Sequence, residues 1–518
     1  MSTSTSTMAG KKGLKTGALG LMSSTVIGLS STAPAYSLAA ALGFIVLGGE
    51  ALVGFQAPGI IILAFIPMFF ISIAYKELNR VEPDCGTVFT WSARAFGSRT
   101  GWMGGWALIA ADIIVMANLA QIAGSYSFTF VGGIVGNPDI VALSSDVVWS
   151  TVAGLIWIVL MTWISYRGIE ISARLQYWLL AIELVVLIAF AVVALGRVYS
   201  GNGVDGSTLP ELSWFNPFTL DFSTAIAPAV LTALFIYWGW DTAVAVNEET
   251  SNPSKTPGRA AILSTLLLVV TYLLVTVGAV AFAGVGETGI GLGNPENADD
   301  IFAAIGPALF GDSVLGQIMM LLLAASILTS AAACTQTTIL PTARGALSMA
   351  SFKALPNSFA TIHPKFLTPT WSTWGMGIAS AGFYLVFTLI SPNLLIALIG
   401  ALGLLIAVYY GLTGFAAAWF FRKTLTRSAR NFFMRGLIPL AGGVSMAVVF
   451  AYGLQQFLLP DWLVDADGNN VTIFGLGAVG VVGLMSIAVG VVLMIWWNIV
   501  NSEFFKGKTL ERRAHTAD

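Results

Sequence analysis

The sequence is poor in charged residues, histidine and cysteine. Only 10% of its 518 residues are charged, against roughly 25% in a typical soluble domain. Two cysteines, Cys85 and Cys334, do not make a disulfide framework, and we expect no disulfide between them. The net charge of −2 gives no sign of nucleic-acid binding. With 56% hydrophobic residues and a mean hydropathy of +0.83, the composition indicates a chain that lies mostly in lipid.

Several chemical motifs are missing as well. There is no Gly-x4-Gly-Lys-Ser/Thr loop, so ATP is not expected to drive any process here. The two histidines, His363 and His515, fall in polar segments outside the apolar runs, which excludes a histidine relay inside the membrane. The sequence shows no metal-ligand cluster and no Ser/His/Asp set. These absences disfavour a membrane-embedded enzyme, and we expect no cofactor.

Apolar runs of about 20 residues, the length that spans a bilayer, occur twelve times. The runs cover residues 18–46, 55–75, 101–131, 147–166, 172–197, 224–250, 260–284, 313–343, 371–390, 393–421, 435–457 and 472–499. The first run is long and lacks an obvious cleavage site after its polar, basic leader. We therefore predict a first membrane span and not a removed signal peptide.

The distribution of charge supports this count. Twelve spans put both termini on one side, and with that side inside, every Lys and Arg except Arg197 falls in an inner segment. The outer loops carry mainly acids, namely Asp139, Asp146, Glu287, Glu296, Asp299, Asp300, Asp461, Asp465 and Asp467. The sequence thus predicts a multi-pass protein of the cytoplasmic (inner) membrane with both termini cytoplasmic.

The sixth run, which contains "FIYWGWDTAVAVNEETSNP" (235–253), is interrupted. Gly239-Trp240-Asp241 puts a flexible joint and a carboxylate between half-helices 224–236 and 241–250, which would be about 20 and 15 Å long. Non-helical backbone at this depth is tolerated only where it is buried in protein or lines a cavity. Asp241 either caps the second half-helix or belongs to a functional site.

The first run has a similar interruption in "SSTVIGLSSTAPAYS" (23–37). Spans one and six are equivalent if the chain consists of two halves of five spans each. A matched pair of Gly/Pro-interrupted segments marks the binding site of a transporter. The alternative is that small residues merely let helices pack closely. That alternative explains one polar span better than a corresponding pair, so we favour a binding site.

Four stretches together resemble the amino acid–polyamine–organocation transporter superfamily, and the likeness extends over most of the chain. The stretches are "YWGWDTAVAVNEETSNPSKTPGRA" (237–260), "AYKELNRVEPDCGTVFTWSARAFGSRTGWMGGW" (74–106), "TARGALSMASFKALP" (342–356), with Arg344 in the arginine position of the family, and "HPKFLTP" (363–369). The resemblance implies an all-α membrane protein with a LeuT-like fold. Ten core spans would form a five-plus-five inverted repeat with discontinuous helices 1 and 6, followed by two peripheral helices.

The implied division of the chain follows from this repeat. It comprises a cytoplasmic tail (1–15), a first repeat (16–197), a second repeat (224–421), two peripheral helices (435–499) and a second cytoplasmic tail (500–518).

The resemblance also implies where a substrate binds. A carboxylate would rest on backbone amides of span one and an amino group on carbonyls of span six, with Phe235 closing over the substrate from outside. The corresponding residues here are Ile27, Gly28, Leu29, Ser30, Ser31, Thr32, Phe235, Ile236, Tyr237 and Trp238. The usual Gly-x-Gly of span one reads Gly28-Leu29-Ser30, so the pocket shape, and with it the choice among amino acids and amines, is left open.

Three acids lie within spans: Asp112, Glu183 and Asp241. A charged acid at mid-span costs about 2.5–3.5 kcal/mol, so such residues are functional by default. Glu183, in "LQYWLLAIELVVLIAF" (175–190), stands where some proton-coupled members of the superfamily carry a lysine in place of a sodium site. Burial favours the protonated form of a carboxyl group. We therefore expect Glu183 to load a proton outside and release it inside, unless it only makes a structural hydrogen bond.

The alternatives concern the coupling ion and the substrate. Thr329 and Ser330 in span eight offer oxygen ligands for sodium, although polar groups there also serve as helix glue. Asp112 either gates or lines an exit path, or makes a buried hydrogen bond. Intramembrane acids without a base would also suit an amine or polyamine carrier. A channel is disfavoured because polarity concentrates at two joints. The leading interpretation is a secondary active transporter that imports amino acids, by proton symport.

Overall fold

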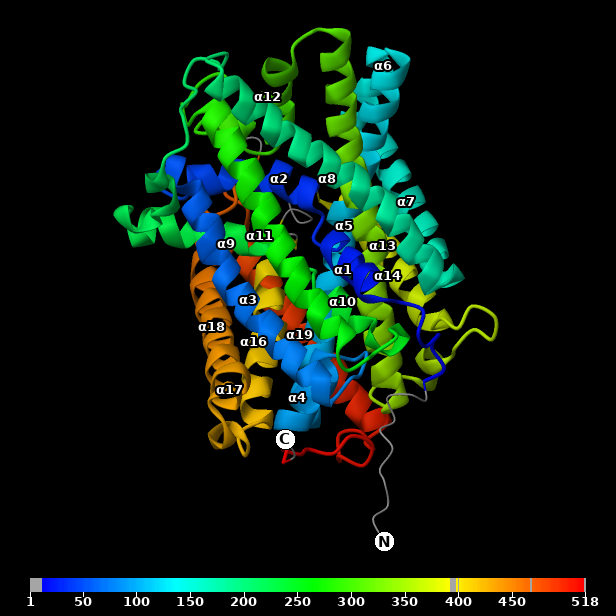
Figure 1. Cartoon of the computed structure of the whole chain (residues 1–518). Coiled ribbons are helices and arrows are strands. Elements are labelled where there is room, and N and C mark those ends of the chain that lie inside the picture. Colours follow the sequence, from blue (N-terminus) through cyan, green and yellow to red (C-terminus); the bar gives the residue numbers. More distant parts are fainter. Residues whose placement is uncertain (1–11, 392–396, 399, 466–467, 517–518) are drawn as a thin grey trace.

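The computed structural model describes residues 12–391, 397–398, 400–465 and 468–516. Its helices form one bundle, and the first and last described segments lie at the same end of it (Figure 1), which we call the terminal end. Helices α6 (Pro138–Ala142) and α12 (Ile301–Phe310) lie at the opposite end. These two helices belong to the loops in which the sequence places its outer acids.

The regular elements are almost all helical. The remaining helices are α1 (Leu21–Ser30), α2 (Pro34–Leu47), α3 (Ala57–Val81), α4 (Val88–Phe96), α5 (Ser98–Val135), α7 (Val147–Arg167), α8 (Ile169–Tyr199), α9 (Ala227–Ile236), α10 (Thr242–Ala245), α11 (Thr256–Ala283), α13 (Val314–Ser351), α14 (Thr370–Ile390), α16 (Leu402–Phe420), α17 (Ala429–Asn431), α18 (Ile438–Phe457) and α19 (Ala478–Val500). Strands β1 (Thr472–Ile473) and β2 (Leu476–Gly477) pair antiparallel.

Eleven helical segments of the described chain are long and apolar enough to cross a membrane. They correspond to eleven of the twelve predicted spans, with α1 and α2 counted as one. The missing span is the sixth, because its two halves, α9 and α10, are each too short to cross alone. The count of twelve is therefore close, and its one departure is the segment that the sequence marks as broken.

Both breaks have a local cause. Pro34 is the first residue of α2, a position that suits proline because the N–H it lacks would have no helical acceptor there. Ala33, just before it, takes the left-handed conformation with φ 45°. At the other break, α9 ends at Ile236 and Gly239 has φ 114°, a conformation that glycine adopts at little cost.

Two predicted boundaries need correction. The span predicted from residue 472 starts only at Ala478, because residues 472–477 form the β1–β2 hairpin, with a turn through Gly475 at φ 78°. The start of the run predicted at 393–421 falls on 392–396 and 399, outside the described residues, and α16 covers its later part.

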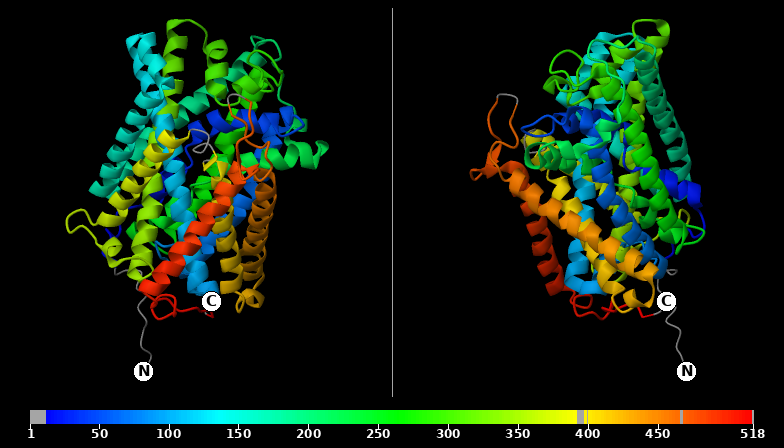
Figure 2. Two further views of the ribbon diagram at one scale, coloured as in Figure 1. Left: turned by 180° about the vertical axis from the view of Figure 1, so that it is seen from behind. Right: turned by 60° about the vertical axis from the view of Figure 1, so that its left-hand side comes forward.

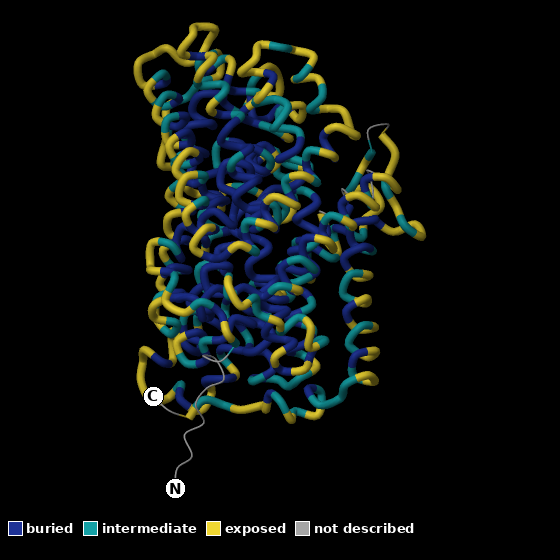
Figure 3. The backbone as a smooth tube through the Cα atoms, turned by 90° about the vertical axis from the view of Figure 1, so that its right-hand side faces the viewer, coloured by how far each residue is buried: buried dark blue, intermediate teal, exposed yellow. Residues whose placement is uncertain are grey.

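The centre of the bundle is built on α5 and α13. Each has 38 residues, about 57 Å of helix, and the two pack against each other. Buried backbone fills the interior, and exposed segments gather on the outside and at the ends (Figure 3). Helices α18 and α19 lie on the periphery (Figure 2). This arrangement leaves the two breaks enclosed by α3, α5, α8, α11, α13 and α16.

Candidate substrate and coupling site

The two breaks touch each other. The Ser31 and Thr242 hydroxyls are 2.9 Å apart, which joins the first break to the start of α10. A Cβ atom built on Gly239 would stand 2.2 Å from the Ser31 carbonyl oxygen, so no residue larger than glycine fits between these two segments of the chain. The same carbonyl accepts a hydrogen bond from the Cys334 thiol of α13 at 3.1 Å. Segments more than 200 residues apart in sequence thus meet at one point.

Asp241 does not cap α10, so the capping interpretation is wrong. It stands at the first position before the helix, but its side chain makes no capping hydrogen bond. Its carboxylate instead accepts hydrogen bonds from the hydroxyls of Tyr410, at 2.8 Å, and Tyr75, at 3.4 Å. With 4% of Asp241 exposed, this is a buried acid held by phenols from α16 and α3.

A small cavity of about 10 Å³ lies beside the breaks. It is lined by Ser31, Leu108, Asp112, Trp238, Gly239, Asp241, Thr242, Thr338 and Pro341. Asp112 lines this cavity and accepts a hydrogen bond from the Thr342 hydroxyl of α13, which is the buried hydrogen bond offered as one alternative. A role for Asp112 in an exit path stays a prediction. The volume suits about one water molecule. A solute much larger than water therefore does not fit in this cavity as it stands.

The span-one residues that the resemblance assigns to substrate divide between the end of α1 and the break. Ile27, Gly28 and Leu29 lie inside α1, which ends at Ser30, while Ser31 and Thr32 form the break itself. The hydroxyl of Ser30 is buried without a hydrogen-bond partner in the structure. The break is thus shorter than the predicted set, and substrate contacts of the residues inside α1 stay a prediction.

The span-six residues surround the end of α9. The Ile236 carbonyl accepts a 2.6 Å hydrogen bond from Tyr272, and the Tyr237 hydroxyl donates to Ile61 of α3 at 3.1 Å. Trp238 lines the cavity, and its ring centroid is 6.3 Å from that of Phe235, which is half-buried. A gating role for Phe235 stays a prediction.

Glu183 joins three helices at the start of α2. Its Oε1 accepts hydrogen bonds from the Ala35 backbone N–H and from the Ser330 hydroxyl of α13, both at 2.7 Å. Its other oxygen, Oε2, is buried and has no partner among the described residues. No arginine or lysine pairs with it in the described part of the chain. This setting favours a protonated carboxyl group, because a buried unpaired charge is costly.

The two proposed sodium ligands are not equivalent. Ser330 is fully buried, donates to Glu183 and accepts from the Tyr36 N–H at 3.2 Å. Thr329 is half-buried, and its hydroxyl donates to Ser326 of its own helix at 3.1 Å. In this conformation both hydroxyls donate to other protein oxygens, and a sodium site at this pair stays a prediction.

The sequence does not single out the aromatic cluster beside Asp241. Tyr410 stacks on Trp240, with centroids 5.4 Å apart, and Tyr75 meets both rings edge-on. The Trp238 indole donates to the Tyr409 hydroxyl. Two adjacent tyrosines in the tenth apolar run were the available signal, because buried phenols need polar partners, but the sequence analysis did not use it.

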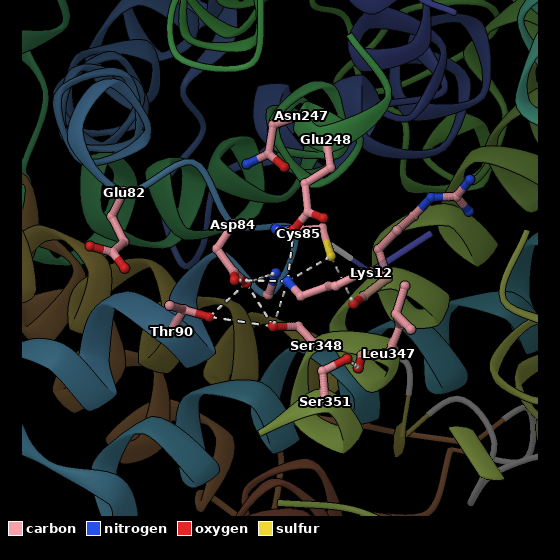
Figure 4. Close-up of polar contacts among 12 residues, drawn as sticks. Lys12, Glu82, Asp84, Cys85, Thr90, Asn247, Glu248, Leu347, Ser348 and Ser351 are labelled. Carbon is pink, nitrogen blue, oxygen red and sulfur yellow. Dashed lines mark hydrogen bonds and ion pairs between the residues drawn. The ribbon is translucent and has the colours of Figure 1, made fainter. Parts of the chain in front are cut away.

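A polar layer, drawn in Figure 4, gathers around Lys12 in the first described segment, at the terminal end. The Lys12 ammonium, 4% exposed, donates to Asp84 and Glu248, each at 2.7 Å, and to the Ser348 hydroxyl at 3.4 Å. The Cys85 sulfur is 3.5 Å from the same nitrogen. Asp84, Cys85 and Glu248 form a set of metal-ligand type that the sequence analysis missed, but the Lys12 ammonium stands at its centre.

Lys12 and Asp84 of this layer stabilise each other's charged forms. Burial works to raise the pKa of Asp84, but the Lys12 ammonium and hydrogen bonds from Lys12, Ser348 and Gly86 outweigh it and hold the pKa below its usual value. Burial works to lower the pKa of Lys12, and the neighbouring acids raise it above normal. Burial also raises the pKa of the Cys85 thiol. Lys12 and Asp84 are therefore charged at neutral pH, whereas Cys85 is protonated.

Glu249, the residue after Glu248 in the "NEETSNP" stretch, forms a second buried ion pair next to the Lys12 contacts. Glu249 pairs with Arg344 of α13 through two 2.8 Å bonds, and both side chains are fully buried. The segment before α1 joins the layer through backbone bonds, because Leu19 donates to Glu249 and accepts from Ser251. The two motif glutamates thus connect the second break to the segment that precedes the first.

Removing Lys12 is expected to open this layer. Lys12→Gln leaves two buried carboxylates without their cation, which costs about 3–5 kcal/mol. In a Cys334→Ser background, alkylation of Cys85 by a water-soluble maleimide should therefore speed up about a hundredfold or more. The matched control is Lys15→Gln, in the same segment, because Lys15 pairs with Glu170 at the surface, where such pairs contribute little. Equal labelling rates in the two variants would contradict a closing role for Lys12.

Comparisons with known proteins agree with this geometry. A family model described as amino acid permease matches residues 19–483. The chain belongs to the amino acid permease family. It is similar to the branched-chain amino acid permease BcaP of Lactococcus lactis subsp. cremoris, 28% identical over 44% of this chain and 50% of that protein. It is also similar to the methylthioribose transporter of Bacillus subtilis, 25% identical over 65% of this chain and 69% of that protein.

The fold comparison covers more of the chain than either of these two relatives. The crystal structure of MhsT in complex with L-phenylalanine, a LeuT-fold transporter, matches with a TM-score of 0.60 at 15% identity, over 83% of this chain and 98% of that one. This permease is therefore an all-α, multi-pass membrane protein with a LeuT-like fold and a transport role. Because the matched region covers only half of the Lactococcus protein, the substrate is not carried over from it.

Proposed function

We propose that this permease imports an amino acid by alternating access, in symport with a proton carried by Glu183. The contact of the two breaks carries the proposal. Polar atoms of Ser31, Thr242 and Asp241 meet there, next to a cavity that α5 and α13 complete. The polar layer at the terminal end supports a carrier and not a channel, because access from that side needs the Lys12 and Arg344 ion pairs to separate.

Glu183 suits proton coupling by its place. It links α8 to the first residues of α2 and to α13, so its protonation state acts directly on the helix that begins at the break. One charge moved through 100 mV is worth about 2.3 kcal/mol, or roughly 50-fold accumulation. Sodium symport is the competing proposal, and it requires the Thr329 and Ser330 hydroxyls to give up their present acceptors, Ser326 and Glu183, for an ion.

The orientation and organisation are proposed with it. The terminal end faces the cytoplasm, because the basic residues of the sequence gather in segments assigned to that side. The membrane is then the cytoplasmic membrane, with both termini inside. The chain divides into repeats over 16–197 and 224–421, and α18 and α19 are the peripheral pair.

An amine or polyamine is the second candidate substrate, favoured by a specific observation. Asp112 and Asp241 both line the small cavity, and no basic residue is among its lining residues in the described chain. A cationic substrate would be attracted there, whereas an amino acid also needs a partner for its carboxylate, which backbone N–H groups at the first break would supply.

Proteoliposomes test the proposal directly. Purified protein is first screened with amino acids and amines by thermal shift, because a bound ligand stabilises the folded state. Uptake of the strongest ligand is then measured under a pH gradient in sodium-free buffer, and under a sodium gradient without a pH gradient. We expect saturable uptake that is stimulated by internal substrate and driven by the pH gradient alone. Uptake that requires sodium rejects proton symport, and non-saturable flux rejects a carrier.

A further inference from the structure

A basic cavity at the terminal end has no part in the transport site. It has a volume of about 400 Å³ and lies between the end of α3 and the segment that leads into α18. Its lining consists of Arg80, Arg427, Ser428, Arg430, Asn431 and Arg435. Four guanidinium groups around one hollow are unusual in a chain with so few charges.

One of these arginines is buried and incompletely paired. Arg435 is 4% exposed, its Nε donates to Glu77 at 3.0 Å, and its guanidinium lies over the Phe421 ring. Its Nη1 is buried and has no hydrogen-bond partner among the described residues. A buried charged donor without an acceptor is costly. This donor of a cavity-lining residue thus lacks the acceptor that its burial calls for among the described residues.

Two further features make the cavity suited to an anion. Glu77 is buried and pairs with both Arg430 and Arg435, so one acid serves two of the guanidinium groups that line the cavity. Ser428 caps the helical segment that runs from Ala429 to Phe457, and its Oγ accepts from the Asn431 N–H at 3.1 Å. The positive end of that helix therefore faces the same region.

The neighbouring surface is apolar. Phe432, Phe433 and Leu437, in the turns that follow Asn431, are 48%, 48% and 46% exposed. Arg80 lies one residue before the end of the span-length helix α3. Basic groups at a span end, directly next to lipid-facing side chains, stand at the depth of phospholipid headgroups.

We propose that this cavity binds the phosphate group of an anionic phospholipid in the leaflet at the terminal end. The shared chemistry is a phosphate held by several guanidinium groups, which arginine recognises in bidentate geometry. A dissolved phosphate ion offers the same group, but it leaves the apolar rim of Phe432, Phe433 and Leu437 uncovered. The rim therefore favours a lipid as the source.

Binding to the full-length protein in detergent tests the proposal. Thermal shift is titrated at constant ionic strength with dioctanoyl phosphatidylglycerol, dioctanoyl phosphatidylcholine and inorganic phosphate. We expect the phosphatidylglycerol to bind at least about tenfold more tightly than the other two. The double variant Arg80→Gln/Arg430→Gln removes two exposed charges and should weaken that binding by about 25-fold, about fivefold for each cation.

The matched control is Lys365→Gln, which removes an exposed positive charge from the loop before α14. It should leave phosphatidylglycerol binding unchanged. An equal loss in this control would show general surface attraction and overturn the proposal. Inorganic phosphate binding as tightly as the lipid would overturn the lipid source, and an unaffected double variant would overturn the site.

Discussion

Replacing Glu183 with glutamine is expected to abolish concentrative uptake and leave substrate exchange intact. The amide keeps an oxygen that accepts from Ala35 N–H and Ser330 as Glu183 does, so the packing of α8, α2 and α13 is retained. It cannot gain or lose a proton in the transport cycle. Accumulation against a gradient should therefore fall from about 50-fold, the value for one proton at 100 mV, to no accumulation.

The measurement is uptake and counterflow in the same proteoliposomes. Glu170→Gln is the control on the same helix, because Glu170 lies in the first turn of α8 and pairs with Lys15 at the surface. It should accumulate substrate normally. If the Glu183 variant still accumulates substrate under a pH gradient, the proton is carried elsewhere, and Asp241 and Asp112 become the next acids to replace.

Replacing Gly239 with alanine is expected to abolish both uptake and exchange. The new Cβ would stand 2.2 Å from the Ser31 carbonyl oxygen, and Gly239 has φ 114°. That backbone conformation costs about 1–3 kcal/mol for another residue, before the contact with Ser31 is relieved. The two breaks must then separate or the joint must re-form, and either change disrupts the surface proposed to hold substrate.

Substrate-induced thermal shift and counterflow measure this effect together. Gly196→Ala is the matched control, because Gly196 lies inside α8 and an added Cβ there meets nothing within 4 Å. The control should bind and transport normally. Retained counterflow in Gly239→Ala would show that the close approach of the breaks is not needed for transport. Glu183→Gln and Gly239→Ala therefore differ in expected outcome, because only the Gly239 change is expected to abolish exchange.

Local sequence predicted the membrane spans and their interruptions. Runs of apolar residues specify spans because a bilayer requires about 20 of them, and eleven such helices are present. Pro34 and Gly239 mark the breaks because each acts on its own backbone, through a missing N–H or an unusual φ. These properties need no knowledge of the neighbouring helices.

The partners of the polar residues were not predictable in the same way. The sequence left Asp241 as either a helix cap or a site residue, and it could not show that Tyr75 and Tyr410, 166 and 169 residues away, donate to it. It likewise offered Thr329 and Ser330 as sodium ligands or as helix glue, and it could not show that Ser330 donates to Glu183 while Thr329 donates to its own helix. A polar residue in an apolar run indicates that a polar partner is needed, but which residue is the partner depends on the helices that pack against it.

An all-α membrane protein, its two broken spans and three acids within its spans follow from the order of residues alone. The contact of the breaks at Ser31 and Gly239, the pairing of Lys12 with Asp84 and Glu248 and the arginine-lined cavity become visible only in the folded bundle. Hydrophobic length and backbone conformation are local properties of the chain, whereas a hydrogen bond or ion pair between distant segments exists only once the helices have packed.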